Sequence, residues 1–232
     1  TGVVVAELVL IHSINSTATK LLNLYSKNPY DGKTYHIVYD ASSAGSLSTT
    51  SVGFAWAGYT LTGWAYDYNG TGSSSTIAVS GPGDFYAVWK ANDITVTLSP
   101  GSTYASAGTG YIYYTFGTAT YYSNSTHTST ISTITCPTRT GYTFNGYYTA
   151  SGGSGTKYIA NNGAIDSGLS GDNRLARKQT ANLTLHAYWT ANSYTVTANA
   201  DFTATIRNLS PNTFFYIRLV WNWKYCNKKH CL

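Results

Sequence analysis

Side chains that could transfer protons, attack a substrate or bind a metal are few and scattered in this chain. Glu7 is the only glutamate, and most of the eight aspartates lie beside Gly, Asn or Ser, at Asp31, Asp40, Asp67, Asp166 and Asp172. These neighbours predict turns and not paired catalytic carboxylates. The five histidines are isolated, and no nucleophile elbow, phosphate loop or metal-binding histidine pair occurs. We therefore expect no catalytic residues and no enzyme.

The three cysteines leave two interpretations open at the C-terminal end of the sequence. Cys136 stands alone before Pro137 and is expected to be a small buried apolar residue. Cys226 and Cys231, in "CNKKHC", could form a short-loop disulfide in an oxidising compartment. Together with His230 they could instead be part of a metal site. Three ligands within six residues and no fourth make a poor zinc pattern, so we expect no metal and no cofactor.

Tyrosines are the strongest candidates for binding, because the chain contains 22 of them. Exposed Tyr side chains can stack on sugars or on another protein. Tyr66 and Tyr68 flank a Gly-rich turn, and Tyr121 and Tyr122 lie where tyrosines crowd together. We take these four residues as candidate ligand-binding residues. The alternative, that their rings fill the protein core, is equally open because side chains alternate between the two faces of a strand.

The composition is typical of a β protein that stays soluble through hydroxyls and amides. Charged residues make up only 10% of the chain, against about 25% in most soluble domains. Ser, Thr, Gly, Asn and Tyr replace them, which suits strands and the turns between them. The net charge of +5 gathers late in the sequence, but no nucleic-acid-binding motif accompanies it, so we expect no nucleic-acid partner. No run of 18 apolar residues predicts a transmembrane helix.

The first 32 residues differ from the rest and form an apolar leader (residues 1–32). Apolar positions continue to Tyr25 at a spacing that loosely fits a helix, closed by Pro29 and Gly32. The run from Val3 to Ile11 could equally be a buried strand. The candidate assembly residues are Val3, Val4, Val5, Glu7, Leu8, Leu10 and Ile11. A leader of this kind could join subunits, complete a neighbour's sheet, or pack on its own chain.

Two phrases recur in the same order along the chain. "GYTLTGWAYD", from Gly58, and "GYTFNGYYTA", from Gly141, are 83 positions apart, and "FYAVWKAN" and "LHAYWTAN" are 100 positions apart. Alternating strands, "YHIVYDAS" and "DITVTLSP", open the two units. This internal repeat divides the chain into β units 33–92 and 93–192, with a degenerate or truncated third unit at 193–232. Their tryptophans, Trp64, Trp89 and Trp189, are expected in the cores.

The second unit permits more detailed expectations. Tyr142, Phe144 and Tyr148 share one parity of a strand and are expected to point to one face. Gly141 and Gly146 predict a close backbone approach or a bulge. "ASGGSGT" predicts an exposed hairpin turn. "NSTHTSTISTI" could form one short helix, with Asn124 or Ser125 as its N-cap.

The repeats resemble the internalin B-type, or Listeria–Bacteroides, repeats of bacterial surface proteins. The resemblance covers about residues 35–192 and is carried by "ITVTLSP", "PTRTGYTFNGYYT" and "LHAYWTAN" in unit two, and by "IVYDAS", "GYTLTGWAYD" and "FYAVWKAN" in unit one. Unit one lacks the proline that precedes the Gly-Tyr phrase in the family. The resemblance implies a mainly β chain of tandem small β-grasp-like modules on a bacterial cell surface. Separately, "GVVVAELVLI" resembles the start of type IV pilins, where a glutamate at the fifth position, here Glu7, lies in an apolar helix.

These resemblances predict a structural or adhesive function. We expect a non-enzymatic extracellular subunit of a bacterial surface assembly or pilus-like filament, which self-associates into a polymer through the leader. The alternative is a monomeric surface adhesin module that binds a host protein or glycan through exposed aromatic residues.

Overall fold

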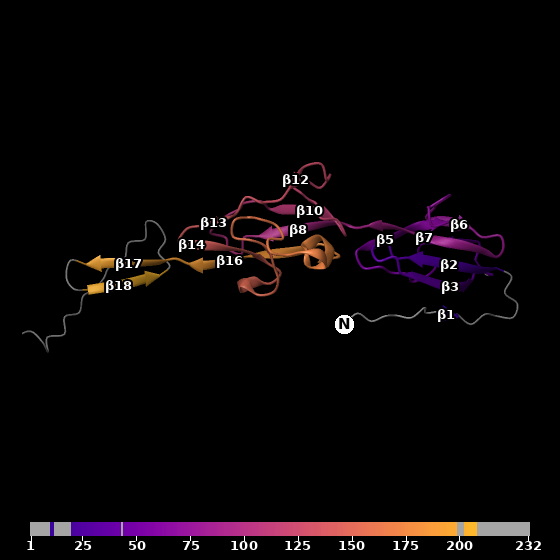
Figure 1. The fold of residues 1–232 in the computed structure, drawn as a ribbon, viewed down its shortest axis with the longest axis horizontal. Helices are drawn as coiled ribbons and strands as arrows, with labels where there is room; N and C mark the ends of the chain where they lie inside the picture. The colour runs from indigo at the N-terminus through magenta and orange to yellow at the C-terminus, as the bar shows by residue number, and fades with distance from the viewer. Residues whose placement is uncertain (1–9, 12–19, 43, 199–201, 208–232) are drawn as a thin grey trace, which may run out of the picture.

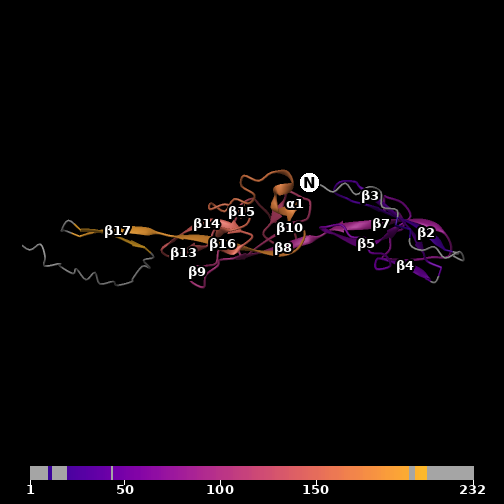
Figure 2. The same ribbon diagram turned by 90° about the horizontal axis from the view of Figure 1, so that it is seen from below.

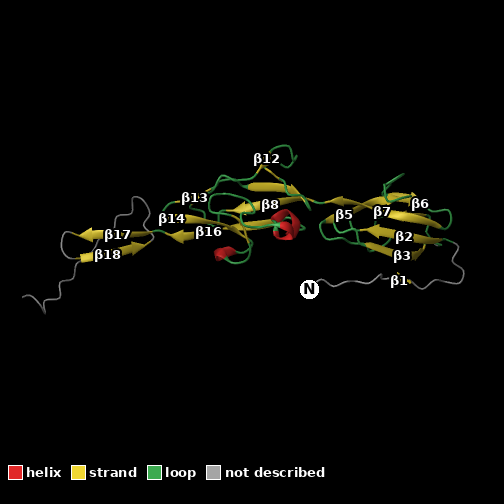
Figure 3. Ribbon diagram, viewed as in Figure 1, coloured by secondary structure: helices red, strands yellow, loops and turns green. Residues whose placement is uncertain are grey.

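The computed structural model describes residues 10–11, 20–42, 44–198 and 202–207. In this part of the chain the fold is mainly β, as expected, with strands gathered into several sheets. Two views at right angles show an elongated molecule in which two large sheets follow one another along the long axis (Figures 1 and 2). The helical segments are short and lie around the second large sheet (Figure 3): η1 (Ser151–Gly153), η2 (Gly171–Asn173) and α1 (Leu175–Lys178).

The first large sheet has the strand order β1-β3-β2-β7-β5. Its strands are β1 (Leu10–Ile11), β2 (Leu21–Lys27), β3 (Thr34–Asp40), β5 (Tyr59–Ala65) and β7 (Gly83–Ala91). Strand β2 pairs antiparallel with β3 and parallel with β7. A small second sheet, β4 (Ser46–Ser48) with β6 (Thr76–Ala78), contributes Leu47 and Ile77 to the same core. Apolar side chains from both sheets therefore enclose one core, in which Leu22, Leu24 and Trp64 are fully buried.

The second large sheet repeats this arrangement and extends it at both edges. Its order is β12-β11-β10-β8-β16-β14-β15. The strands are β8 (Asp93–Ser99), β10 (Tyr111–Thr115), β11 (Tyr121–Tyr122), β12 (Thr130–Ile131), β14 (Tyr142–Tyr148), β15 (Lys157–Ile159) and β16 (Leu183–Ala191). The central order β10-β8-β16-β14 corresponds to β3-β2-β7-β5, because β8 and β16 are again the parallel pair. A separate pair joins β9 (Ala105–Ser106) to β13 (Thr138–Arg139).

A third two-stranded sheet lies beyond the second large sheet (Figure 1). It pairs β17 (Ser193–Ala198) with β18 (Phe202–Arg207) in antiparallel register. Ser193 opposes Arg207 as Asp93 opposes Thr115 in the hairpin that opens the second large sheet. The third opening strand that the sequence indicated at residue 193 is therefore present.

The helix expected through the leader is wrong for residues 21–27, which form β2 in the middle of the first sheet. Leu22, Leu24 and Ser26 are buried and their neighbours are not, a period of two that only a strand places on one face. The first sheet thus extends across the expected boundary at residue 32. Strand β2, and not the "YHIVYDAS" segment, is the counterpart of β8, because each pairs in parallel with the closing strand.

The glycines of the repeated phrase act as the sequence indicated. The pairing of β14 with β16 shifts between Phe144 and Gly146, so the predicted bulge is confirmed, and the same shift occurs at Gly63 in β5. The bulge also corrects an expectation. It inserts one residue, so Tyr147 joins Phe144 in the core and Tyr148 turns to the other face.

The two expected connections of unit two differ in outcome. The segment 149–156 is an exposed hairpin turn between β14 and β15, as expected, with Thr149 N donating to Thr156 O at 3.0 Å. The expected short helix after Asn124 is wrong. Asn124 Oδ1 instead accepts from the backbone N–H groups of Thr128 and Ser129, which closes the tight turn between β11 and β12. Side chains that bind the backbone locally compete with a helix, and here the turn prevails.

A repeated asparagine follows the closing strand of each large sheet and binds to the Gly-Tyr-Thr strand of the same sheet. Asn92 N donates to Gly58 O at 2.9 Å, and Thr60 Oγ1 donates to Asn92 Oδ1 at 2.6 Å. Asn192 makes the same two bonds, from its N–H to Gly141 O at 2.9 Å and from Thr143 Oγ1 at 2.7 Å. The Gly-Tyr-Thr phrase and the Ala-Asn phrase therefore recur together because they bind each other.

Candidate functional site

The leader residues proposed for assembly are only partly within the described structure. Val3, Val4, Val5, Glu7 and Leu8 lie outside the described residues, as do Cys226 and Cys231. Leu10 and Ile11 form β1, which pairs in parallel with Ile37 and Val38 of β3 at the edge of the first sheet. At these two residues the leader is therefore a strand, and it pairs with its own chain.

The four candidate tyrosines divide into two kinds. Tyr66 and Tyr68 are 57% and 52% exposed, so both are accessible to a ligand. Tyr121 is 4% exposed, so its ring belongs to the core and the prediction that it binds a ligand is wrong. Tyr122 is half-buried and stacks on His127 with ring centroids 4.7 Å apart. The alternation of β11 explains the difference, since Tyr121 faces the core and Tyr122 faces away from it.

Tyr121 belongs to a buried polar network around Asp166. Its hydroxyl donates to Asp166, which also accepts from Leu175 N at 2.9 Å and from Arg174 Nε at 3.3 Å. Ala176 N donates back to the Tyr121 hydroxyl at 3.2 Å. Burial, together with the neighbouring Asp166 carboxylate, raises the pKa of Tyr121 above its ordinary value. The network fixes the loop between β15 and β16 against β11, which is a structural role.

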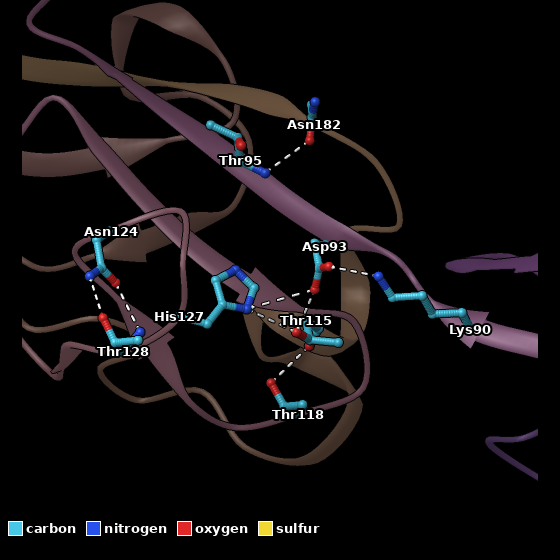
Figure 4. Close-up of polar contacts among 9 residues, drawn as sticks. All are labelled: Lys90, Asp93, Thr95, Thr115, Thr118, Asn124, His127, Thr128 and Asn182. Atoms are coloured by element: carbon cyan, nitrogen blue, oxygen red, sulfur yellow. Dashed lines mark hydrogen bonds and ion pairs between the residues drawn. The ribbon is translucent and has the colours of Figure 1, made fainter.

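A second polar cluster lies where the two large sheets meet, and its side chains point toward one another in Figure 4. Thr115 Oγ1 donates to Asp93 Oδ1 at 2.7 Å and lies 3.1 Å from His127 Nδ1. Lys90 Nζ lies 3.3 Å from Asp93 Oδ2. The Thr115 hydroxyl holds the pKa of Asp93 below its ordinary value, with a smaller contribution from Lys90.

This cluster resembles a catalytic triad in composition but not in its proton arrangement. The single proton of the Thr115 hydroxyl is donated to Asp93, so the nearby His127 Nδ1 faces that oxygen as a donor. A histidine base would have to accept this proton to activate the hydroxyl. The arrangement therefore fixes the turn that carries His127 to β10 and leaves no activated nucleophile.

A groove of about 450 Å³ adjoins this cluster, with Lys90 and Asp93 in its lining. Its polar lining comes from both sheets, with Thr60, Thr62, Lys90, Asn92, Thr180 and Asn182. Asn182 Oδ1 accepts from Thr95 N at 2.8 Å, and Asn92 is held by the junction bonds described above. These bonds fix the lining within each unit, Asn182 to β8 of the second sheet and Asn92 to β5 of the first.

An aromatic row crosses the outer face of the first sheet. Tyr25 stacks between His36 at 4.6 Å and Tyr86 at 5.0 Å, and Tyr68 meets Tyr86 edge-on at 4.5 Å. Cross-strand register brings the first three together, because Tyr25 opposes His36 on β3 and Tyr86 on β7. Lys27 Nζ lies 5.9 Å from the ring centre of Tyr68.

Polar groups flank this aromatic row. Asn23 Nδ2 donates to Asp84 Oδ1 at 2.7 Å, so the Asn23 carbonyl oxygen faces His36 Nε2, 3.3 Å away, and that nitrogen carries a hydrogen. Burial raises the pKa of the Tyr68 hydroxyl above its ordinary value. A hollow of about 240 Å³ opens beside Tyr68, between Lys27, Asp67, Asn69 and Trp89.

Sequence reasoning identified Tyr68 but missed its surroundings. Tyr25, His36 and Tyr86 come from three different strands, and only the register of β2 with β3 and β7 brings them together. The alternation within β2 carried a signal for Tyr25, but the helical interpretation of the leader obscured it. Asp166 was expected in a turn and does have a positive φ of 54°, yet nothing nearby in the sequence marked its burial.

Among the described residues no group of His, Cys, Asp and Glu side chains could hold a metal ion. Within the same part of the chain no helix has the length and apolar character needed to cross a membrane. Comparison of the chain with protein-family models, with curated proteins and with solved structures gives no match.

Proposed function

We propose that this chain is a non-enzymatic extracellular structural protein of bacterial type, a subunit of a cell-surface assembly or pilus-like filament. In this proposal the two large sheets are tandem β-grasp-like modules of the kind that the internalin B-type repeats suggested. Their shared strand order and their repeated asparagine junctions support the modular interpretation. The chain extends lengthwise, as suits a spacer or a fibre (Figure 1).

The observation that carries the proposal is the pairing of β1 with β3. An edge strand presents unpaired N–H and C=O groups that a further strand can bind. Here the leader itself supplies that strand, through Leu10 and Ile11 beside Ile37 and Val38. The same edge can accept the leader of a neighbouring copy, which would join subunits without any new surface.

Electron microscopy of the native material and of purified full-length chains tests this function. Filaments of the intact chain, absent after deletion of residues 1–19, are the expected result. The deletion must end there because Leu22 and Leu24 of β2 belong to the core. Ile11→Pro removes the backbone N–H and is expected to reduce polymers, whereas Ile11→Ala keeps that N–H and is the matched control. Monomers at all concentrations would contradict the proposal.

The exposed side chain of Tyr68 favours a second candidate, a monomeric surface adhesin that binds a host protein or a glycan. This function requires no polymer. It predicts that Tyr68→Ser loses binding in an assay in which the leader deletion leaves binding unchanged. Tyr68→Ser and the leader deletion therefore distinguish the adhesin from the filament subunit.

A further inference from the structure

Each of the two large sheets carries a similar aromatic cluster on its outer face. In the first, Tyr86 of β7 meets Tyr68 edge-on at 4.5 Å, with Lys27 over the Tyr68 ring. In the second, Tyr188 of β16 meets Tyr148 edge-on at 5.9 Å, and Lys157 Nζ lies 5.4 Å from the centre of the Tyr148 ring. Strands β7 and β16 are equivalent, so both clusters occupy the same face of the same strand.

A glycine-rich turn adjoins the aromatic side chains in both sheets. A Cβ on Gly153 would lie 2.8 Å from the Tyr188 ring, and a Cβ on Gly72 would lie 2.9 Å from the ring of Tyr66. The turn at Gly153 therefore packs directly against Tyr188, whereas the turn at Gly72 packs against Tyr66, next to the Tyr68 cluster. Tyr68 and Tyr188 nevertheless remain 52% and 36% exposed. A tyrosine ring held by its neighbours and still open to solvent binds with little loss of side-chain entropy.

We infer that these two clusters, the Tyr68 cluster (Lys27, Tyr68, Tyr86) and the Tyr188 cluster (Tyr148, Lys157, Tyr188), bind successive parts of a neutral polysaccharide. This inference rests on the adhesive form of the proposed function and is independent of polymer formation. The apolar C–H face of a sugar ring packs on an aromatic ring, while its hydroxyl groups need donors and acceptors close by. Tyr68 offers the ring, and Lys27, Asp67 and Asn69 line the adjoining hollow.

The hollow beside Tyr68 has the size and the mixed lining that suit a sugar ring. A stable protein interface buries about 800 Å² on each partner and has an apolar centre. The hollow beside Tyr68 measures about 240 Å³, and its lining combines polar side chains with apolar ones such as Pro29, Val88 and Trp89. This volume is below the usual range of about 300–1,000 Å³ for small-molecule sites, which suits a single sugar ring.

The charges near the clusters favour a neutral glycan over an anionic one. Each cluster has one lysine. In the first, Asp67 lines the hollow together with Lys27, and Asp84 lies on the same face of the sheet as Tyr86. Binding of a polyanion draws on several cations acting together. Two clusters on one chain also favour a polymer, because a ligand that spans both gains from effective concentration.

Affinity electrophoresis of the full chain tests the inference. The gels contain a soluble neutral polysaccharide, with mixed-linkage β-glucan, mannan and dextran as separate probes. They run toward the cathode at about pH 6, because the isoelectric point is about 9.0. The variants are Tyr68→Ala, Tyr188→Ala and their double, and Tyr68→Phe keeps the ring. Tyr104→Ala is the matched control, since that side chain is 86% exposed and lies outside both clusters.

We expect at least one probe to retard the chain. Each single alanine variant is expected to weaken binding about threefold to tenfold, and the double variant more than about tenfold. Tyr68→Phe and Tyr104→Ala retain binding. Circular dichroism confirms that the variants fold.

Three results would overturn the inference: no retardation by any probe, retention unchanged in the double variant, or a loss confined to Tyr68→Ala. Capture of a protein ligand that depends on Tyr68, without retardation by any probe, would also overturn it and would leave the adhesive function in place. Filaments seen by microscopy bear only on the assembly proposal, so the two failures remain distinguishable.

Discussion

Replacement of Gly146 by alanine tests the close approach of β14 and β15 at the bulge. Gly146 has a φ of 116°, and a Cβ placed there would lie 2.3 Å from Ile159 O. Strain at such a backbone conformation costs about 1–3 kcal/mol, and forcing a methyl group into a packed site costs about as much again. We expect Gly146→Ala to lower the free energy of unfolding by about 2–6 kcal/mol, a large part of a typical domain's stability.

Gly152→Ala is the matched control for this change. Gly152 has a φ of 73°, but a Cβ there would have no heavy atom within 4 Å. It therefore carries the conformational cost alone, about 1–2 kcal/mol. Both free energies come from urea unfolding followed by circular dichroism, with hydrogen exchange of the β14 and β15 amides as a local measure. Equal destabilisation by the two variants would refute the steric argument.

Three further changes test the buried hydroxyls and the junction. Tyr121→Phe leaves Asp166 and Ala176 N each without one partner, and it is expected to cost about 1–3 kcal/mol in urea unfolding, whereas a neutral result would contradict the network. Burial raises the pKa of Tyr147 to about 12, above the unfolded value of about 10, so stability is expected to fall as pH rises between these values. Tyr147→Phe should reduce this fall in unfolding curves measured at pH 9 to 12, and an unchanged slope would oppose the assignment. Phe116→Ala removes a ring that packs at the junction against Tyr59 and against the backbone of Gly58. We expect the free energy of unfolding to fall by about 3 kcal/mol, and small-angle X-ray scattering to show a broader distribution of molecular lengths.

The sequence predicted those parts of the fold that depend on local pattern. The bulge at Gly146, the hairpin turn at 149–156 and the opening strand at Ser193 followed from glycine spacing and alternation. The core position of Trp64 followed from the same rules, whereas Trp89 and Trp189 are half-buried. The repeat also indicated that the Gly-Tyr-Thr and Ala-Asn phrases belong together, although not that they bind each other.

The sequence could not settle features that depend on long-range pairing. Leu22 and Leu24 fit a helix or a strand equally until their partners on β7, about 60 positions later, are known. Tyr148 faced the wrong side in the prediction because one inserted residue at the bulge reverses the parity of all that follow. The burial of Asp166 depends on Tyr121 and Arg174, which approach it from separate segments.

The parallel pair at the centre of each large sheet determines how the chain bears tension. In the first sheet the parallel neighbours are β2, near the start of the sheet's sequence, and β7, at its end, and they pair over four residue pairs. Strands β8 and β16 are the first and last strands of the second sheet and pair in the same way. A pull on the two ends of either sheet draws these strands in opposite directions along their length. All their hydrogen bonds are then loaded together in shear, and none can open first as in a zipper. The two sheets are thus connected in series, each with its most resistant contact placed on the line of force.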